Sequence, residues 1–493
     1  MKDNLTLPQK FKLFASICLF SVSFLFTSEL AAQTSNEILE VQQRLSFAGY
    51  DPGPEDGLWG RKTEDALKVF LLDQGLSFDG LLSLNELAAL RAATREYGVE
   101  QAVQYENFSE IPESARPNNA TIALYEDNRR IFLQRLISGG NAYRIRPAGN
   151  AVPFQEDLLP ANPTIEHELS DGYLLSYLYY EDGVIRYNGL PPTERFNPAV
   201  DDQTLFFTHS TGKSIVSYIV GHAICEGYIQ SADEVIDWPM MQNTVYDGQT
   251  LKDLLNMNAG DSHVVTNGAS RVIGADQHHR DMGIDTIASY LQGTERRGSA
   301  VFYNNVLTDI IASYVAYRSG DNYDALLREV FQNKIRIEHD VYFELHRMTQ
   351  TNGEWSPYLG DMQTRASYSF QMTRSDFLRV AEAMMHDYQQ QTCVGQYLRE
   401  AQNSAVEWPK YRPRNDNAHL WIHNYAARYG SQFYFEFHGM RDRNIIATEG
   451  YNGQNIMVDL DNSRIVITNS AATGWDQRTF VLNVIRDGEL PSG

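Results

Sequence analysis

Cysteine is scarce in this sequence, with three residues among 493. Cys18 lies within an apolar stretch near the N-terminus, which leaves Cys225 and Cys393 for the rest of the chain. Two cysteines are too few for a disulfide framework, so the class of small disulfide-stabilised proteins is excluded. These two cysteines either pair with each other or remain free buried thiols. Because Cys225 falls within an apolar helical run, core packing is its favoured role.

Basic residues are also few: 41 lysines and arginines face 63 aspartates and glutamates, which gives a formal net charge of -22. Such a chain is repelled by phosphate backbones and anionic lipid surfaces, so nucleic acid and anionic membranes are excluded as general partners. An anionic glycan would have to be bound in a local groove. The hydrophobic content of 43% nevertheless suffices for a large core.

The apolar run from Leu13 to Phe26 is short for a membrane span. Three lysines precede this run, and Ala31-Ala32 provides small residues for cleavage. This pattern is typical of a secretory signal peptide, predicted at residues 1–32, with an uncleaved anchor as the alternative. No lipobox leads into Cys18, so no lipid anchor is expected. The mature protein is therefore predicted to be exported, to the periplasm or outside the cell, without stable membrane insertion.

Motifs for metal ligands are missing as well, because the chain has neither HExxH nor paired-cysteine spacing. His278-His279 has Asp276 and Asp281 nearby, but a solvated histidine pair is the favoured interpretation. No metal and no cofactor are predicted.

A short segment, Ser210-Thr211-Gly212-Lys213, opens an apolar stretch with helical period. Residues three apart on a helix share a face, so Ser210 and Lys213 are predicted to lie side by side. A lysine whose pKa is lowered by burial can take a serine proton, and a helix N-terminus favours developing negative charge. The pattern indicates an activated nucleophile. The alternative is a helix-capping serine and a solvated lysine.

The second candidate segment, Phe302-Tyr303-Asn304-Asn305, leads into another predicted helix with a buried face. A phenol close to an ammonium group can be drawn towards phenolate, act as a general base and later protonate the leaving group. An asparagine amide can orient both lysine and substrate. Tyr303 and Asn305 are therefore candidate catalytic residues, with a core tyrosine and a capping asparagine as the alternative.

A glycine-rich segment runs from Gly450 to Gln454, before a predicted hairpin formed by Asn455 to Leu460 and Arg464 to Thr468. Glycines such as Gly450 and Gly453 let the backbone approach a ligand closely. A main-chain N–H here, together with the N–H of Ser210, is therefore a candidate oxyanion hole. The alternative is a plain glycine-rich turn.

In chain order, these three segments resemble the SxxK, YxN and third motifs of the serine β-lactamase and penicillin-binding-protein superfamily, closest to its class C β-lactamase-like branch. Thr250 to Gly260 and Ser369 to Met384 are similar to two further segments of that branch. An alternating hairpin from Tyr173 to Tyr187 precedes the nucleophile, as the family's first two strands do. The resemblance implies that Ser210 is the nucleophile and that Lys213 and Tyr303 share its proton.

The third motif departs from this family. It usually carries a lysine or histidine that holds a substrate carboxylate, whereas this chain has Glu449-Gly450-Tyr451. Glu449 would repel such a carboxylate unless Arg441 or Arg443 compensates, so efficient β-lactamase activity is not expected. The string Gly450 to Gln454 instead resembles the G-x-x-G-Q of 6-aminohexanoate-dimer hydrolases and related esterases. That resemblance implies an amidase or esterase whose oxyanion hole is completed by the N–H of Tyr451.

Two histidines need separate interpretations. His209 precedes the nucleophile directly, but adjacent side chains at a helix entry diverge, so a local structural role is favoured over a triad base. His438 would restore a cation if it occupied the third motif. The hairpin after Gly453 fits that motif better.

Residues 36–92 carry a separate pattern that includes Val41 to Leu45, Gly49-Tyr50 and Asp56 to Gly60. The stretch resembles the type 1 peptidoglycan-binding domain, with Trp59 and Leu71 in place of the usual phenylalanine and glutamine. It predicts a bundle of three short helices and a possible peptidoglycan partner. The alternative is a spacer or a module for docking a protein.

The sequence thus predicts an α+β multidomain protein: a three-helix bundle at 36–92, a linker with extra elements at 93–165, and a β-lactamase/D,D-peptidase-type domain at 166–490. The latter is expected to hold an antiparallel sheet flanked by helices, plus a helical subdomain. The predicted function is an exported, wall-associated serine hydrolase acting on a small amide or ester. A D,D-peptidase, penicillin-binding protein or β-lactamase is one alternative, and a non-catalytic peptidoglycan-binding protein is another.

Overall fold

The structure, a computed structural model, describes residues 35–78, 82, 84–94, 119–196, 200–266, 272–275, 282–347, 359, 362–472 and 474–492. The chain divides into two compact units, residues 1–90 and 91–493. The predicted signal peptide, residues 95–118 of the predicted linker and His278-His279 lie outside the described residues.

The first unit has three helices, α1 (Ser35–Phe47), α2 (Arg61–Asp73) and α3 (Leu84–Ala93). Its small core joins Val41 and Leu45 of α1 to Phe70 and other apolar residues of α2 and α3. Gln42 ties the helices to the connecting loop: its amide nitrogen donates to Thr63 Oγ1 (3.2 Å), and its oxygen accepts from the Gly57 N–H (2.9 Å). The predicted three-helix arrangement is therefore observed.

A nine-stranded sheet forms the centre of the second unit, in the order β2-β4-β3-β14-β13-β12-β11-β10-β9. All its neighbouring strands are antiparallel except β2 and β4. The strands are β2 (Gln155–Glu156), β3 (Leu174–Glu181), β4 (Val184–Gly189), β9 (Val406–Glu407), β10 (Ala426–Gly430), β11 (Phe433–Phe437), β12 (Ile445–Gly450), β13 (Gln454–Asp459) and β14 (Arg464–Ser470). The central strands β12 and β13 are buried along their whole length, so the sheet is covered on both faces.

Both predicted hairpins are present, as β3/β4 and β13/β14. In the first, Asp182 and Gly183 have φ values of 50° and 91°, as a tight two-residue turn with the twist of its strands requires. A smaller sheet, order β1-β6-β8-β5 with β7 beside β6, consists of β1 (Ala142–Ile145), β5 (Phe206–Phe207), β6 (Val341–Arg347), β7 (Met362–Arg365) and β8 (Gln371–Met372).

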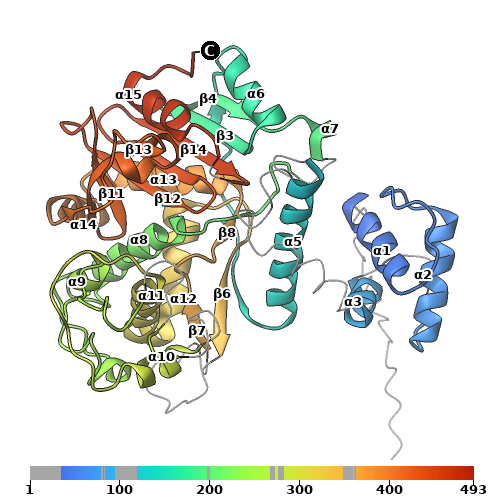
Figure 1. Cartoon of the computed structure of the whole chain (residues 1–493), viewed down its shortest axis with the longest axis horizontal. Helices are drawn as coiled ribbons and strands as arrows, with labels where there is room; N and C mark the ends of the chain where they lie inside the picture. Colours follow the sequence, from blue (N-terminus) through green and yellow to red (C-terminus); the bar gives the residue numbers. More distant parts are fainter. Residues whose placement is uncertain are drawn as a thin grey trace, which may run out of the picture. The chain divides into compact units, whose positions relative to one another are not determined.

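Helices surround the large sheet (Figure 1), and α8 lies between it and a helical group that contains α9, α10 and α11. The α-helices are α5 (Asn119–Ser138), α6 (Pro163–Asp171), α7 (Thr193–Phe196), α8 (Thr211–Cys225), α9 (Leu251–Leu255), α10 (Ile284–Tyr290), α11 (Asn305–Ser319), α12 (Tyr323–Arg328), α13 (Arg374–Gln389), α14 (Cys393–Asn403) and α15 (Val484–Asp487). Short 3-10 and π segments are η3 (Pro239–Met241), η5 (Gly320–Asn322), η6 (Glu329–Ile335), η7 (Ala418–Leu420), η8 (Ile422–Tyr425) and η9 (Arg478–Asn483). This arrangement is the predicted sheet, flanking helices and helical subdomain.

Within the predicted linker region, residues 119–138 form the single 20-residue helix α5, one of the extra elements expected there. Its apolar residues Ile131, Leu133 and Leu136 are buried, so α5 packs onto the second unit. Strands β1 and β2 fall within the predicted linker region and pair with β6 and β4.

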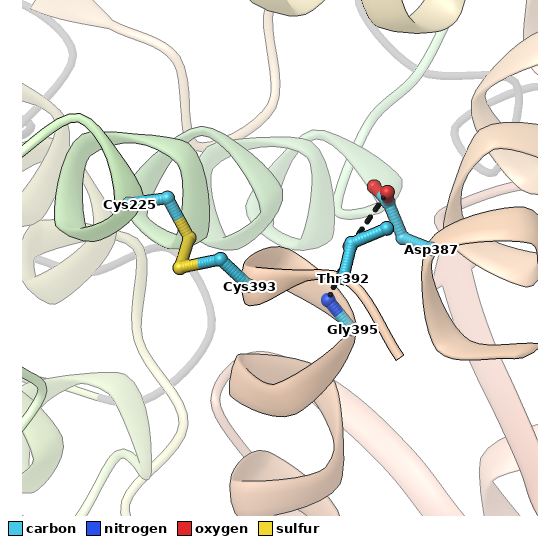
Figure 2. Close-up of a disulfide and its surroundings, with 5 residues drawn as sticks. All are labelled: Cys225, Asp387, Thr392, Cys393 and Gly395. Atoms are coloured by element: carbon cyan, nitrogen blue, oxygen red, sulfur yellow. Dashed lines mark hydrogen bonds between the residues drawn. A yellow bond between two sulfur atoms is a disulfide. The ribbon is translucent and has the colours of Figure 1, made fainter. Parts of the chain in front are cut away.

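The two remaining cysteines are paired: Cys225 and Cys393 form a disulfide with a Cα–Cα distance of 5.9 Å (Figure 2). The bond joins the last residue of α8 to the first residue of α14. Thr392, directly before Cys393, caps α14 and also donates to Asp387 Oδ1 (2.8 Å) on α13. The favoured interpretation of Cys225 as a core-packing residue is therefore corrected to pairing, because α8 and α14 pack together and bring the two cysteines into contact. The bond constrains α8, which begins directly after the candidate nucleophile.

Candidate active site

Ser210 directly precedes α8, and its partly exposed hydroxyl lies 3.1 Å from Lys213 Nζ. His209 before it has a positive φ of 47°, an unusual backbone conformation for a non-glycine residue. Gly450 of β12 backs this turn so closely that an added Cβ would lie 2.2 Å from the Thr208 carbonyl oxygen. The Thr211 hydroxyl donates to the Gln454 carbonyl oxygen (2.6 Å), which locks the start of α8 onto β13.

Lys213 is 1% exposed and is held in place by three acceptors. Besides Ser210 Oγ, its ammonium donates to Asn305 Oδ1 (2.5 Å) and to the Ser367 carbonyl oxygen (3.1 Å). Two adjacent asparagines at the start of α11 have different partners. Asn304 accepts from the Leu307 N–H (3.1 Å) and caps the helix, whereas Asn305 accepts from the Lys213 ammonium. The structure therefore brings Ser210, Lys213 and Asn305 together.

Burial lowers the pKa of Lys213 to about 7, and the nearby Asp309 carboxylate opposes this shift. Asp309 lies one turn after Asn305 on α11 and accepts from the Ser367 N–H (3.0 Å). A substantial fraction of Lys213 is thus neutral at physiological pH and can accept a proton. Sequence reasoning missed Asp309, although its i+4 spacing from Asn305 is a usable signal.

Tyr303 is the third residue at the nucleophile, and its hydroxyl hydrogen-bonds with the hydroxyls of Ser210 and Tyr434. The Lys213 ammonium lies 5.1 Å from the centre of its ring. Burial raises the pKa of Tyr303, whereas the bonds from Ser210 and Tyr434 lower it and the Glu449 charge raises it further. The resting site therefore favours a neutral phenol, which differs from the expectation that lysine draws Tyr303 towards phenolate. Desolvation by burial is the largest effect on the pKa of Tyr303, and it disfavours the charged phenolate.

The turn between β12 and β13 brings Tyr451 beside the nucleophile, with its ring centre 5.8 Å from that of His209. Gly453 has a φ of 82° and abuts Trp475 and Ser470, so this turn requires glycine there. Among the residues that the structure describes, the N–H groups of Ser210 and Tyr451 donate no hydrogen bond. Two main-chain donors are thus free on the candidate oxyanion side.

The glutamate of the third motif is not paired with an arginine. Glu449 is buried, and its Oε2 accepts from the N–H (2.9 Å) and the Nδ1 (2.7 Å) of His423. Its Oε1 is buried without a hydrogen-bond partner among the described residues. The Glu449 charge acts on Tyr303, Tyr434 and Lys410, so this carboxylate lies near the candidate catalytic phenol.

The cations suggested by sequence as compensation for Glu449 are placed elsewhere. Arg443 pairs with Asp459 and donates to the Ile485 carbonyl oxygen (2.8 Å), so it has a structural role. Arg441 lies 5.1 Å from the ring centre of Tyr411. Lys410, which sequence reasoning missed, lies near a candidate catalytic residue, with its ammonium 5.8 Å from the Tyr303 ring centre. It lies on a loop, and no sequence motif marks it.

The histidines follow the structural interpretations. His209 receives a contact from Arg129 Nη2 (3.1 Å) at Nε2, and burial with the Arg129 and Lys213 charges lowers its pKa well below the usual value. His438 lies just after β11 and contacts the Tyr411 hydroxyl through Nδ1 (2.8 Å), away from the third-motif turn. Groups of three or more metal-ligating side chains are absent from the described ranges. No helix in those ranges is long and apolar enough to cross a bilayer.

Comparisons with known proteins agree with the division of the chain into two units. Residues 34–90 match the family model described as "Putative peptidoglycan binding domain". No curated protein matches the sequence.

Among solved structures, a protein described as "Putative 6-aminohexanoate-dimer hydrolase from Bacillus anthracis" is similar with a TM-score of 0.51 at 13% identity. The match covers 75% of this chain and 97% of that one. A putative β-lactamase from Bacteroides dorei has a TM-score of 0.45 at 14% identity, covering 66% and 97%. A class C β-lactamase from Rhodobacter sphaeroides has a TM-score of 0.41 at 14% identity, covering 62% and 91%.

At these identities the likeness concerns the fold. Together, the nine-stranded sheet, the SxxK helix and the Bacillus anthracis match agree with the predicted architecture. Residues 34–90 thus match a peptidoglycan-binding family model, and the second unit has a fold similar to that of the Bacillus anthracis protein.

Proposed function

We propose that the second unit is a serine hydrolase that cleaves an amide or ester through an acyl-enzyme at Ser210. The observation that carries the proposal is the hydrogen bond between Lys213 Nζ and Ser210 Oγ, made by a lysine whose pKa burial lowers to about 7. An ordinary surface lysine stays charged at neutral pH and cannot act as a base. This one can.

In the proposed mechanism, neutral Lys213 takes the Ser210 proton as Oγ attacks the carbonyl carbon. The N–H groups of Ser210 and Tyr451 hold the oxyanion, with Gly450 and Gly453 shaping that turn. Tyr303, a neutral phenol, donates its proton to the leaving nitrogen or oxygen and takes up a proton from the Lys213 ammonium, which returns Lys213 to its neutral form. Water then attacks the ester carbonyl with the same groups in reversed roles, and Ser210 is restored.

An amidase or esterase is favoured over a β-lactamase because Glu449 stands where a cation usually holds the substrate carboxylate. The Glu449 carboxylate is buried and held by His423, so it cannot turn away to admit a substrate anion at this position. A D,D-peptidase acting on wall peptides is a second candidate, favoured by the peptidoglycan-binding match at residues 34–90.

Export is supported by two independent features. The first is the signal-like N-terminus; the second is the Cys225–Cys393 disulfide, a bond that persists mainly in oxidising compartments. With the first unit's family match, the proposed location is periplasmic or extracellular and associated with the cell wall.

The first experiment is intact-protein mass spectrometry after exposure to a fluorophosphonate and, separately, to a penicillin. A single fluorophosphonate adduct that is absent in Ser210→Ala is expected. A persistent penicillin adduct in addition would favour the wall peptidase. Absence of both adducts from folded protein would contradict the hydrolase and favour a non-catalytic wall-binding protein.

A further inference from the structure

A basic recess lies on the segment that directly follows Lys410. The depression has a volume of about 500 Å³ and is lined by Tyr411, Arg412, Pro413, Arg414, Asn415 and His438. Among the described residues that line it there is no carboxylate. In a chain with a net charge of -22, two arginines in one such recess are a local exception to the overall charge.

Arg412 and Arg414 form no salt bridge with any of the described residues, and both are exposed. A third guanidinium, that of Arg441, lies 5.1 Å from the ring centre of Tyr411 in the recess wall. Several other arginines among the described residues of the unit form ion pairs, as Arg428 does with Glu436 and Arg464 with Glu181. The recess arginines are thus available to an external anion.

The backbone of the recess is held in a fixed conformation. The Arg412 N–H donates to the Asn424 carbonyl oxygen (2.8 Å), and the Asn415 N–H donates to the Arg412 carbonyl oxygen (3.1 Å). The Tyr411 hydroxyl contacts His438 Nδ1 (2.8 Å), which joins the loop to the end of β11. A preformed backbone of this kind lowers the entropic cost of binding a ligand.

The chain segment that lines the recess directly follows two residues that lie close to Tyr303. Trp408 and Lys410, which precede it directly, both contact Tyr303: the Trp408 and Tyr303 ring centres are 6.0 Å apart, and Lys410 Nζ lies 5.8 Å from the Tyr303 ring centre. Arg412 is near enough to act on the charge of Lys410. The negative charge of Glu449 also acts on Lys410 and partly compensates the positive charge of that lysine. The positive charge that no carboxylate compensates is therefore that of the recess arginines.

We propose that the Arg412–Arg414 recess binds the carboxylate of the substrate, so that the enzyme prefers amides or esters carrying a remote carboxylate at one end. A guanidinium fork suits this group, since it can donate two parallel hydrogen bonds to a carboxylate. The recess thereby takes over, from a different loop, the anchoring role that Glu449 prevents at the third motif. This inference rests on the proposed hydrolase activity.

The test uses N-(4-fluorophenyl) monoamides of succinic, glutaric, adipic and suberic acid, with their methyl esters as neutral counterparts. Fluorine NMR follows both binding and release of 4-fluoroaniline from the same compound. The full-length mature protein is compared with Arg412→Gln/Arg414→Gln and with the control Arg146→Gln, an exposed arginine outside the recess. Binding without turnover is measured on Ser210→Ala.

At one chain length the free acid is expected to exceed its methyl ester in kcat/KM by about 10- to 100-fold, as expected for a charge-assisted hydrogen bond. In the double variant this ratio falls towards one, and in Arg146→Gln it persists. Equal kcat/KM for acid and ester in wild type, or a ratio unchanged in the double variant, would overturn the proposal that the recess binds the substrate carboxylate.

The two proposals fail separately. Saturable binding of the acid to Ser210→Ala that the arginine substitutions abolish, with no turnover by wild type, would keep the recess and remove the hydrolase mechanism. Turnover of acid and ester alike would keep the hydrolase and remove the recess. Absence of binding and turnover for every chain length would overturn both.

Discussion

The Asp309 carboxylate and the Lys213 ammonium act on each other: Asp309 raises the pKa of Lys213, and Lys213 lowers that of Asp309. Burial is the larger effect on both groups, so Lys213 has a pKa of about 7 while that of Asp309 is raised. The readiness of the lysine to act as a base is therefore set by burial and tempered by one carboxylate on α11.

Labelling of Ser210 should follow the deprotonation of Lys213. The second-order rate constant for fluorophosphonate is expected to rise with pH, with a midpoint near 7, and to level off about one unit above. Asp309→Asn removes the charge that raises the pKa of Lys213, so its midpoint should move to lower pH. Rates measured by mass spectrometry between pH 5 and 9 decide this; an unshifted midpoint in folded Asp309→Asn would show that the carboxylate does not act on the base.

Burial of Lys213 should lower the free energy of unfolding at neutral pH, because the buried ammonium is disfavoured. Since its pKa falls from 10.5 in the unfolded chain to about 7, the unfolded state binds more protons between these values. Wild-type free energy of unfolding therefore gains from this residue as pH rises through the window, by at most about 1.4 kcal/mol per unit. Lys213→Met lacks this dependence, so its advantage over wild type should be largest at pH 7 or below and shrink by pH 9.5. Urea unfolding at several pH values measures it, and a constant difference would contradict the buried, neutral lysine.

Tyr303→Phe should slow turnover about 10²- to 10⁴-fold, because it removes the group that protonates the leaving atom. The matched variant is Tyr434→Phe, which takes away a hydroxyl bonded to Tyr303 but leaves the phenol itself. The decrease in turnover caused by Tyr434→Phe should be much smaller than that caused by Tyr303→Phe. Initial rates on an amide and on a 4-nitrophenyl ester sharpen the comparison, since nitrophenolate leaves without a proton. A defect in Tyr303→Phe that is equal for both substrates would argue against the general-acid role.

Elements with strong local signals were predictable. The apolar period after Ser210 and the turn residues between β13 and β14 arise from interactions close in sequence, and both elements form as expected. Joining SxxK to YxN needed the family resemblance, because the bond from Lys213 to Asn305 spans 92 residues.

Other features had no local signal. Lys410 reaches Tyr303 from a loop, and Ser367 binds Lys213 through its carbonyl oxygen, which any residue type can supply. Pairing of Cys225 with Cys393 depends on α8 and α14 packing together, so two cysteines 168 positions apart gave no indication of it. The protonation of Tyr303 depends on burial, which the tripeptide alone does not determine.

Removal of the disulfide should destabilise the second unit. A link between residues 168 positions apart restricts the unfolded chain strongly and stabilises the folded state by up to about 5 kcal/mol. Urea unfolding of wild type with and without a reductant is expected to show this loss, and Cys225→Ala/Cys393→Ala should match reduced wild type and be insensitive to reductant. A double variant as stable as oxidised wild type would contradict the contribution of this link.

Glu449→Gln should make the site more receptive to anionic acylating agents. Glutamine still accepts a hydrogen bond from the His423 N–H at the position of Oε2, so the turn is kept while the buried charge adjoining Tyr303 is lost. The repulsion between two charges near a protein surface is of order 1 kcal/mol or more, so acylation by a penicillin should quicken at least about fivefold. The rate with a neutral fluorophosphonate serves as the internal reference, and Glu226→Gln, an exposed charge at the far end of α8, as the matched variant. If both reagents accelerate equally in Glu449→Gln, the residue acts on the nucleophile in general. A selective gain with penicillin would instead show that the carboxylate at the third motif is what rejects substrates of the β-lactam type.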